Sequence, residues 1–155
     1  CGSHHFEANG ATSKKCENCG FEYFMNPSAA NVAIIKNAKG EILVERRKQE
    51  PAKGTLDLPG GFTQIGETSE EGVCREVMEE TGLTITNLKY FGSQPWPYPS
   101  GLMIGFTADY VDGEIHLQKE ELSRGKWFSK DNLPILPEKL SIARRLIDAW
   151  LEGEK

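Results

Sequence analysis

Residues 58–83 read LPGGFTQIGETSEEGVCREVMEETGL and contain the pattern that decides the fold. Thr68 and Glu71 can form a capping box, which predicts that a helix begins near Ser69. Gly82 can supply a left-handed C-cap, so the same helix is expected to end just before it. The Pro-Gly-Gly run near the start of the stretch indicates a break in regular structure.

Three glutamates gather on one side of this predicted helix. At about 100° per residue, Glu76, Glu79 and Glu80 fall within an arc of about 100°. One interpretation is a solvated acidic face, and the other is a site for hard divalent cations, because Mg²⁺ prefers carboxylate oxygens. A different arc is apolar and is expected to face a sheet, with its cysteine as an inert core residue: Val73, Cys74, Val77 and Met78.

The spacing around the glutamates favours the cation site. From Gly61 the sequence runs Gly-x5-Glu67-x7-Arg75-Glu76-Val77-Met78-Glu79-Glu80-Thr81-Gly82-Leu83. This run resembles the Nudix box, GX5EX7REUXEEXGU with U aliphatic, at every fixed position. The resemblance implies an enzyme that uses Mg²⁺ or Mn²⁺ to hydrolyse a nucleoside diphosphate linked to another group. It implies that Glu76, Glu79 and Glu80 are metal ligands and catalytic residues. Its implied structural residues are Gly61, Glu67, Arg75 and Gly82, with Glu67 and Arg75 forming a pair.

The pattern outside the box predicts a mixed sheet flanked by two main helices, an α+β fold. Strands are predicted at 30–36, 41–47, 83–94 (with a bulge at Gly92), 102–111, 114–117 and 126–129, and an amphipathic helix at 140–151. Turns are predicted at 37–40 and 112–113, and a proline-rich loop at 95–101. The resemblance implies the Nudix α/β/α sandwich, and we assign the Nudix domain to residues 27–155.

A second motif follows the box. Residues 93–99 read SQPWPYP, and because each proline fixes φ, such a run presents its rings at low ordering cost. A structural loop and a proline-peptide ligand are the alternative interpretations. The run resembles the SQPWPFPxS motif of the NADH pyrophosphatase subgroup, although Tyr98 stands where the motif has Phe and Gly101 where it ends in Ser. Residues 142–147 and Leu133-Pro134 are also similar to that subgroup.

The subgroup resemblance implies a substrate and a set of residues. The expected reaction converts NADH or NAD-type dinucleotides to NMN(H) and AMP. Alternatives are hydrolysis of ADP-ribose, diadenosine polyphosphates or oxidised nucleoside triphosphates, or a non-catalytic module that binds nucleotides or RNA. The intact box argues against that module. The implied substrate-binding residues are Phe62, Gln94, Trp96, Tyr98 and Ala143, and Glu121 is the implied additional metal-binding and catalytic carboxylate.

The cysteines near the N-terminus predict a truncated zinc ribbon at residues 1–26, which are otherwise polar and loop-like. Cys16 and Cys19 form a Cys-x-x-Cys pair followed by glycine, and Cys1 is also followed by glycine. Cys1 would belong to a pair whose other member lies upstream. A redox pair and two unpaired thiols are the alternatives. His4 or His5 is a candidate fourth ligand, unless Gly2-Ser3-His4-His5 is a remnant of a purification tag.

Composition sets outer limits on function. The chain has 155 residues, 38% of them hydrophobic and 26% charged, which predicts a folded protein. It begins without Met, so we expect its natural N-terminus to lie upstream. No apolar run approaches the roughly 18 residues of a membrane span. The net charge of −5 argues against a general nucleic-acid binder, and RNA is expected only through an NAD-type cap. We expect a cytoplasmic, reducing location, and the resemblance implies a homodimer.

Overall fold

The protein contains two separate β-sheets in the part of the chain that the structure describes. The structure is a computed structural model that describes residues 1–47, 54–97, 100–116 and 122–153. The smaller sheet is antiparallel in the order β1–β2–β3, with β1 (Phe6–Ala8), β2 (Ser13–Cys16) and β3 (Glu22–Phe24). The expectation that residues 1–26 are loop-like was therefore wrong. These strands are too short and too polar to show an alternating hydrophobic pattern.

The larger sheet has seven strands in the described residues. Its main path runs β10–β5–β4–β9–β8, while β6 pairs with β5 and β7 with β4. Strands β4 and β9 are parallel, and the other pairs are antiparallel. The strands are β4 (Ser28–Lys36), β5 (Ile42–Arg47), β6 (Leu56–Asp57), β7 (Gly60–Phe62), β8 (Thr84–Trp96), β9 (Gly101–Asp112) and β10 (Leu122–Phe128).

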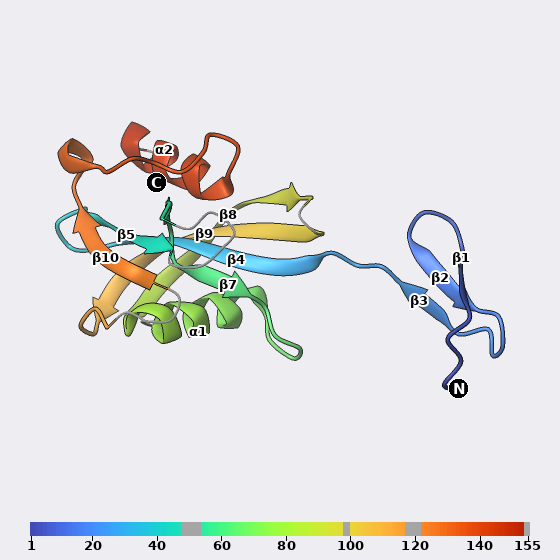
Figure 1. The fold of residues 1–155 in the computed structure, drawn as a ribbon. Coiled ribbons are helices and arrows are strands. Elements are labelled where there is room, and N and C mark those ends of the chain that lie inside the picture. Colours follow the sequence, from blue (N-terminus) through green and yellow to red (C-terminus); the bar gives the residue numbers. More distant parts are fainter. Residues whose placement is uncertain (48–53, 98–99, 117–121, 154–155) are drawn as a thin grey trace.

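The chain changes sheets within a few residues. Met25 N donates to the carbonyl of Thr12 in the smaller sheet at 2.8 Å, and Ser28 N donates to Ser100 at 2.8 Å beside the larger one. Figure 1 shows an extended segment leading from β3 into β4. This change of partners coincides with the division predicted after residue 26, and the assignment of two domains stays a prediction.

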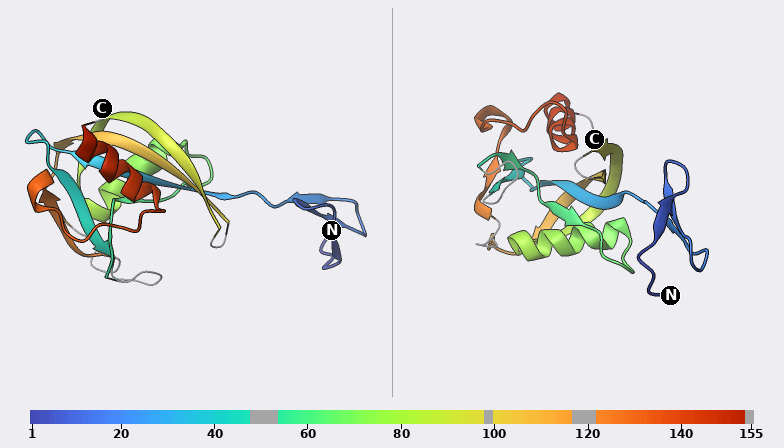
Figure 2. Two further views of the ribbon diagram at one scale, coloured as in Figure 1. Left: turned by 90° about the horizontal axis from the view of Figure 1, so that it is seen from above. Right: turned by 45° about the vertical axis from the view of Figure 1, so that its right-hand side comes forward.

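Two helices cover opposite faces of the larger sheet (Figures 1 and 2). They are α1 (Ser69–Thr81) and α2 (Ile142–Glu152), and a short 3-10 helix, η1 (Lys130–Asn132), lies between β10 and α2. Central strand β4 supplies both cores through alternate residues: Val32 and Ile34 join the core under α2, whereas Ala33 and Ile35 join the core under α1. The predicted α+β sandwich is confirmed.

The helix ends follow the signals in the sequence. Thr68 caps α1 with the predicted capping box to Glu71, and Gly82 ends it with φ 74° in the left-handed region. Ser141 caps α2, whose side chain stripe of Ile142, Leu146, Ile147 and Trp150 is buried as expected. Neither of these helices, nor η1, is long and apolar enough to cross a bilayer.

Three strand predictions need correction. The break predicted at the Pro-Gly-Gly run is confined to Leu58 and Pro59, because Gly60 and Gly61 already form β7 against β4. Strand β8 continues through Pro95 and Trp96, which were expected to lie in the proline-rich loop. Residues 114–116 form no strand, and residue 117 lies outside the described residues. His116 N donates instead to the carbonyl of Thr81 at the end of α1, at 2.8 Å.

The apolar arc of α1 is narrower than expected. Val73 and Val77 are fully buried, but Met78 is 46% exposed and Cys74 is also exposed. The prediction that Cys74 is a core cysteine was therefore wrong. Helix α1 packs on the sheet through a narrow stripe, so positions about 100° away from it lie beyond the contact.

Removing a core side chain under α2 should measure how far this packing stabilises the fold. Ile147 is fully buried, so Ile147→Ala should lower the free energy of unfolding by about 2–5 kcal/mol in urea titrations. The matched control is Ile135→Ala, since Ile135 is 89% exposed and its loss should change stability by less than about 0.5 kcal/mol. Equal effects of the two variants would contradict the assignment of the core.

Candidate functional site

Two consecutive glycines of β7 receive the carboxylates of two α1 glutamates. Gly60 N donates to Glu80 Oε2 at 2.9 Å. A Cβ on Gly61 would lie 2.4–2.7 Å from the carboxylate atoms of Glu76, and a Cβ on Gly60 would lie 2.0 Å from the carbonyl oxygen of Asn31. Gly61 therefore leaves the space that the Glu76 carboxylate occupies, whereas Gly60 allows β7 to lie close to the backbone of β4.

The packing of α1 sets the exposure of the three predicted metal ligands. Because Val73 and Val77 are buried against the sheet, the glutamate side of the helix turns toward β7. Glu80 is 7% exposed, and the side chains of Glu76 and Glu79 are 18% and 53% exposed. The three carboxylates therefore range from buried, at Glu80, to solvent-exposed, at Glu79.

Arg75 links these carboxylates to the loop before the helix. Its Nε and Nη2 donate to the two oxygens of Glu67, at 2.6 and 3.0 Å, which makes a bidentate pair. Its Nη1 donates to Glu76 Oε1 at 2.8 Å and to Glu79 Oε2 at 3.0 Å. Nη2 also donates to the carbonyl of Phe62 at 3.0 Å. The structure thus contains the predicted pair of Glu67 and Arg75.

This ion-pair network shifts the protonation equilibria of its members. Hydrogen bonds from Arg75, and then from the amide of Gln64, hold the pKa of Glu67 below its usual range. Glu67 and Glu76 in turn raise the pKa of Arg75. Both charges of the pair therefore persist across the physiological pH range.

The glutamates suit a hard divalent cation through the chemistry of their donors. All are carboxylate oxygens, which Mg²⁺ and Mn²⁺ prefer, and Gly61 leaves room beside Glu76. Among the residues that the structure describes, only the three cysteines bring three or more ligand atoms within 4.8 Å of one another, so the glutamates are more widely spaced. Glu121, predicted to join them, lies outside the described residues.

The cysteines of the smaller sheet form this compact group. Cys1, Cys16 and Cys19 have sulfur atoms within 4.8 Å of one another, and the sulfurs of Cys1 and Cys16 are 3.8 Å apart. Two thiolates at 2.3 Å from one tetrahedral zinc ion would lie about 3.8 Å apart. Hydrogen bonds lower the pKa of Cys16, and the one from the backbone of Cys19 has the largest effect. The sulfur geometry therefore fits a zinc ion.

Phe62 and Gln94, two of the predicted substrate residues, lie on the α2 face of the sheet. Gln94 pairs with Met103, Met103 with Ala30, and Ala30 with Phe62, so these residues form one row across β8, β9, β4 and β7. Directly paired residues point to the same face, and Met103 packs against the core under α2. Phe62 is 61% exposed, so its ring is accessible at the end of this row.

The remaining predicted substrate residues differ in accessibility. Trp96 follows Gln94 by two positions on β8, so both point to the same face, and Trp96 is 38% exposed. Gln94 Nε2 donates to the carbonyl of Leu140, which ties the motif strand to the segment before α2. Ala143 is 4% exposed within the α2 core, and Tyr98 lies outside the described residues.

Sequence reasoning missed one buried polar residue near the site. Asn31 is 1% exposed in the middle of β4, and its Nδ2 donates to Thr63 Oγ1 at 2.8 Å. The available signal was an asparagine inside the otherwise apolar run ANVAII at residues 30–35. A buried amide in a central strand requires a partner, so its occurrence there points to a local role.

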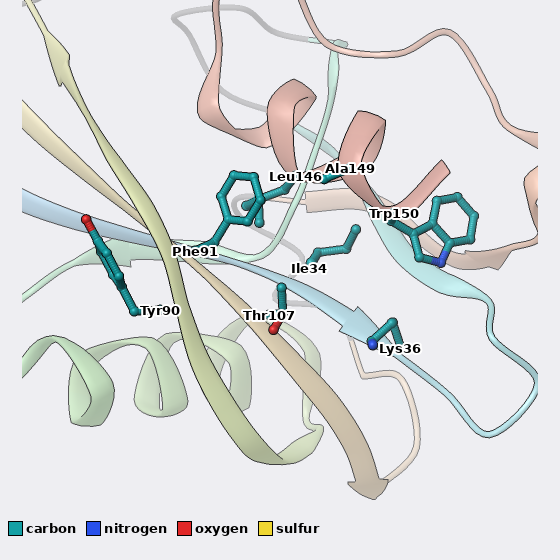
Figure 3. A pocket seen from close by; sticks show the side chains of 8 residues that line it. All are labelled: Ile34, Lys36, Tyr90, Phe91, Thr107, Leu146, Ala149 and Trp150. Carbon is teal, nitrogen blue, oxygen red and sulfur yellow. The ribbon is translucent and has the colours of Figure 1, made fainter. Parts of the chain in front are cut away.

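A separate hollow of about 250 Å³ lies under the C-terminal half of α2. Figure 3 shows Phe91, Leu146 and Trp150 around Ile34, whereas Tyr90 extends from the opposite side of β8. The lining consists of Ile34, Lys36, Tyr90, Phe91, Thr107, Leu146, Ala149 and Trp150. It includes none of the predicted site residues that the structure describes, so this hollow is distinct from the carboxylates and the substrate row.

Comparison with known proteins agrees with this geometry. The chain is 43% identical over 156 residues to the NAD-capped RNA hydrolase NudC of Haemophilus influenzae (strain PittGG), covering 98% of this chain and 58% of that protein. It is 38% identical to the protein of the same name from Klebsiella pneumoniae (strain 342), covering 96% and 57%. The chain thus spans less than two thirds of these relatives.

A solved structure and a family model each match most of the chain. The MutT NUDIX hydrolase from Burkholderia pseudomallei matches with a TM-score of 0.68 and 27% identity, covering 84% of this chain and 99% of that one. The model of the NUDIX domain matches residues 25–151, which include β4 to α2 and the whole glycine-and-glutamate arrangement. The chain therefore belongs to the Nudix family.

Proposed function

We propose that this protein is a metal-dependent pyrophosphohydrolase that cleaves NADH or NAD-type dinucleotides to NMN(H) and AMP. The observation that supports this most is the placement of Glu76 and Glu80 on the glycines of β7, beside the row that leads to Phe62 and Gln94. The similarity to proteins named NAD-capped RNA hydrolase supports the dinucleotide end of the substrate. RNA would enter as a substrate through an NAD-type cap.

The reaction is a hydrolysis at one phosphorus of the diphosphate. A bond forms between the water oxygen and phosphorus, and the bond from phosphorus to the bridging oxygen breaks. The bridging oxygen leaves with AMP or with NMN(H). A carboxylate among Glu76, Glu79, Glu80 and Glu121 accepts the proton of the attacking water. Glu76, Glu79, Glu80 and Glu121 would hold Mg²⁺ or Mn²⁺, which when bound neutralises phosphate charge and makes water more acidic.

The remaining groups orient the substrate. The exposed rings of Phe62 and Trp96 offer surfaces on which a base or nicotinamide stacks. Gln94 and Ala143 lie nearby, and Tyr98 completes the proposed set. Gly60 and Gly61 carry no side chains, so the diphosphate can approach the backbone of β7 beside the α1 carboxylates. Arg75 fixes Glu76 and Glu79 before substrate arrives, which lowers the ordering cost.

We further propose that Cys1, Cys16 and Cys19 hold a structural zinc ion. His4 and His5 lie within four residues of Cys1 and are candidates for the fourth ligand. The proposed location is the cytoplasm, whose reducing conditions keep thiols available for zinc. The proposed assembly is a homodimer.

Replacing Glu80 tests the carboxylate assignment. Glu80→Gln preserves an acceptor for Gly60 N but removes the negative charge, so kcat for NADH with Mg²⁺ should fall by about 10²- to 10⁴-fold while the unfolding midpoint changes little. Glu70→Gln is the matched control, because Glu70 is an exposed residue of the same helix outside the capping box. A fully active Glu80→Gln enzyme would remove this carboxylate from the mechanism.

Replacing Trp96 tests the substrate face. Because stacking on one base contributes about 1–3 kcal/mol, Trp96→Ala should raise KM for NADH by roughly 5- to 150-fold with a smaller change in kcat. Tyr90→Ala is the control, since Tyr90 is an exposed aromatic residue of the same strand on the opposite face. Steady-state rates with NADH, ADP-ribose and a nucleoside triphosphate should favour NADH. An identical profile for the variant and the wild type would make the Trp96 ring purely structural.

Metal analysis tests the cysteine cluster. The purified protein should contain about one zinc per chain, and a thiol-modifying reagent should release it to a colorimetric chelator. Cys19→Ser should lose the zinc, whereas Cys74→Ser should retain it, because Cys74 lies on α1 outside the cluster. Zinc-free wild-type protein, purified without chelators, would be evidence against the site.

A further inference from the structure

Asn31 lies where three segments of the candidate site meet. Its position on β4 pairs with Gly61 of β7, and its carbonyl oxygen is the atom that a Cβ on Gly60 would strike. Its side chain points to the α1 side, since a Cβ on Gly72 in the first turns of α1 would lie 3.0 Å from Asn31 Nδ2. Asn31 therefore contacts β7, the loop after it, and α1.

The loop between β7 and α1 is attached to β4 at Thr63. The Thr63 hydroxyl accepts from Asn31 Nδ2 at 2.8 Å, and Thr63 N donates to the carbonyl of Ala29 at 2.9 Å. The first bond comes from a side chain and the second from the backbone. Loss of the Asn31 amide would leave the backbone bond as the attachment of Thr63 to β4, so the loop could pivot about it.

The same amide lies close to the ion pair that holds the glutamates. A Cβ on Gly72 would be 3.2 Å from Glu67 Oε2 as well as 3.0 Å from Asn31 Nδ2, so both side chains share the space above that glycine. Glu67 in turn makes the bidentate pair with Arg75. The loop itself supplies the printed link, because Asn31 bonds Thr63 and the next residue, Gln64, donates its N–H to Glu67 Oε2 at 2.9 Å. From Glu67 the hydrogen bonds continue through Arg75 to Glu76 and Glu79.

The energetics of Asn31 argue against a role in stability alone. Among the described residues, nothing donates to its Oδ1, and a buried polar group without a partner costs about 1–3 kcal/mol. Valine has a similar volume, suits a central strand and carries no such penalty. The core therefore does not require an amide at this position. We attribute the amide instead to the placement of the loop, which it contacts at Thr63.

We propose that Asn31 is a positioning residue that fixes the loop at 63–68 and, through Glu67 and Arg75, sets where the carboxylates of Glu76 and Glu79 meet a divalent cation. This inference rests on the proposed function, because it assigns those glutamates to a metal site. Mutation of a residue that orients metal ligands without touching the metal typically lowers metal affinity by about 10- to 100-fold.

Asn31→Val in the full chain tests this proposal by three measurements. Its unfolding midpoint should stay close to that of the wild type, because removal of the unpaired Oδ1 offsets loss of the bond to Thr63. Its affinity for Mn²⁺, measured by electron paramagnetic resonance without nucleotide, should fall by about 10- to 100-fold. Hydrogen exchange of the Gln64 and Glu67 amides should become faster. Wild-type affinity together with wild-type exchange in this variant would overturn the proposal.

Ile35→Val provides the matched control. Ile35 is fully buried on the same strand and the same face of the sheet, and its core cluster contains no described residue of the loop at 63–68. This variant should lose about 0.5–1.5 kcal/mol of stability yet bind Mn²⁺ as the wild type does. Asn31→Val should lose Mn²⁺ affinity but not stability, whereas Ile35→Val should lose stability but not affinity. This contrast separates a positioning role from a stabilising one. A parallel fall in affinity in Ile35→Val would attribute the effect to general destabilisation and contradict the proposal.

A second pair of variants covers the case in which Asn31→Val fails to fold. Thr63→Val removes the same hydrogen bond from the loop side and should weaken Mn²⁺ binding, whereas Thr63→Ser keeps the hydroxyl and should restore it. Equal affinities of these two variants would overturn the proposal. If the wild type binds no Mn²⁺, the proposed function fails, and exchange at Gln64 and Glu67 then decides the positioning role alone: unchanged exchange in Thr63→Val rejects it.

Discussion

The close approach of the α1 carboxylates to the backbone of Gly60 and Gly61 is the constraint on which the site depends. Glu80 accepts from Gly60 N at 2.9 Å, and a side chain on Gly61 would occupy the position of the Glu76 carboxylate. Glycine at both positions avoids a steric clash, and the burial of Val73 and Val77 packs α1 against the sheet. Arg75 then balances part of the negative charge that this packing concentrates.

The sheet connects two chemically different faces through β7. Gly61 faces the carboxylates of α1, whereas its neighbour Phe62 shares the α2 face with Gln94 and Trp96. Because successive residues of a strand point to opposite faces, Gly61 faces the acidic side of the sheet and Phe62 the aromatic side. The proposed dinucleotide chemistry assigns the diphosphate to the acidic side and a flat ring to the aromatic side.

The elements with strong local signals could be predicted from the sequence, and those held by distant contacts could not. Capping at Thr68 and Gly82, the α2 stripe and the bulge near Gly92 depend on neighbouring residues and are confirmed. Strand β7 was missed because its pairing depends on β4, about thirty residues earlier in the chain. Short polar strands in residues 6–24 gave no alternating pattern. Cys74 was misplaced because the width of the α1 contact is a property of the packed sheet.

The same distinction holds for the candidate site. The spacing of the box placed the glutamates and Arg75 together on one helix, but Asn31 was missed because its relevance depends on Thr63 and Gly72, which only tertiary structure brings near. The central claim is that the α1 carboxylates beside Gly61 bind a divalent cation. Anomalous scattering from a crystal grown with Mn²⁺ tests it most directly. We expect an anomalous-scattering peak in contact with carboxylate oxygens of Glu76 and Glu80. A manganese ion bound only elsewhere would contradict this claim.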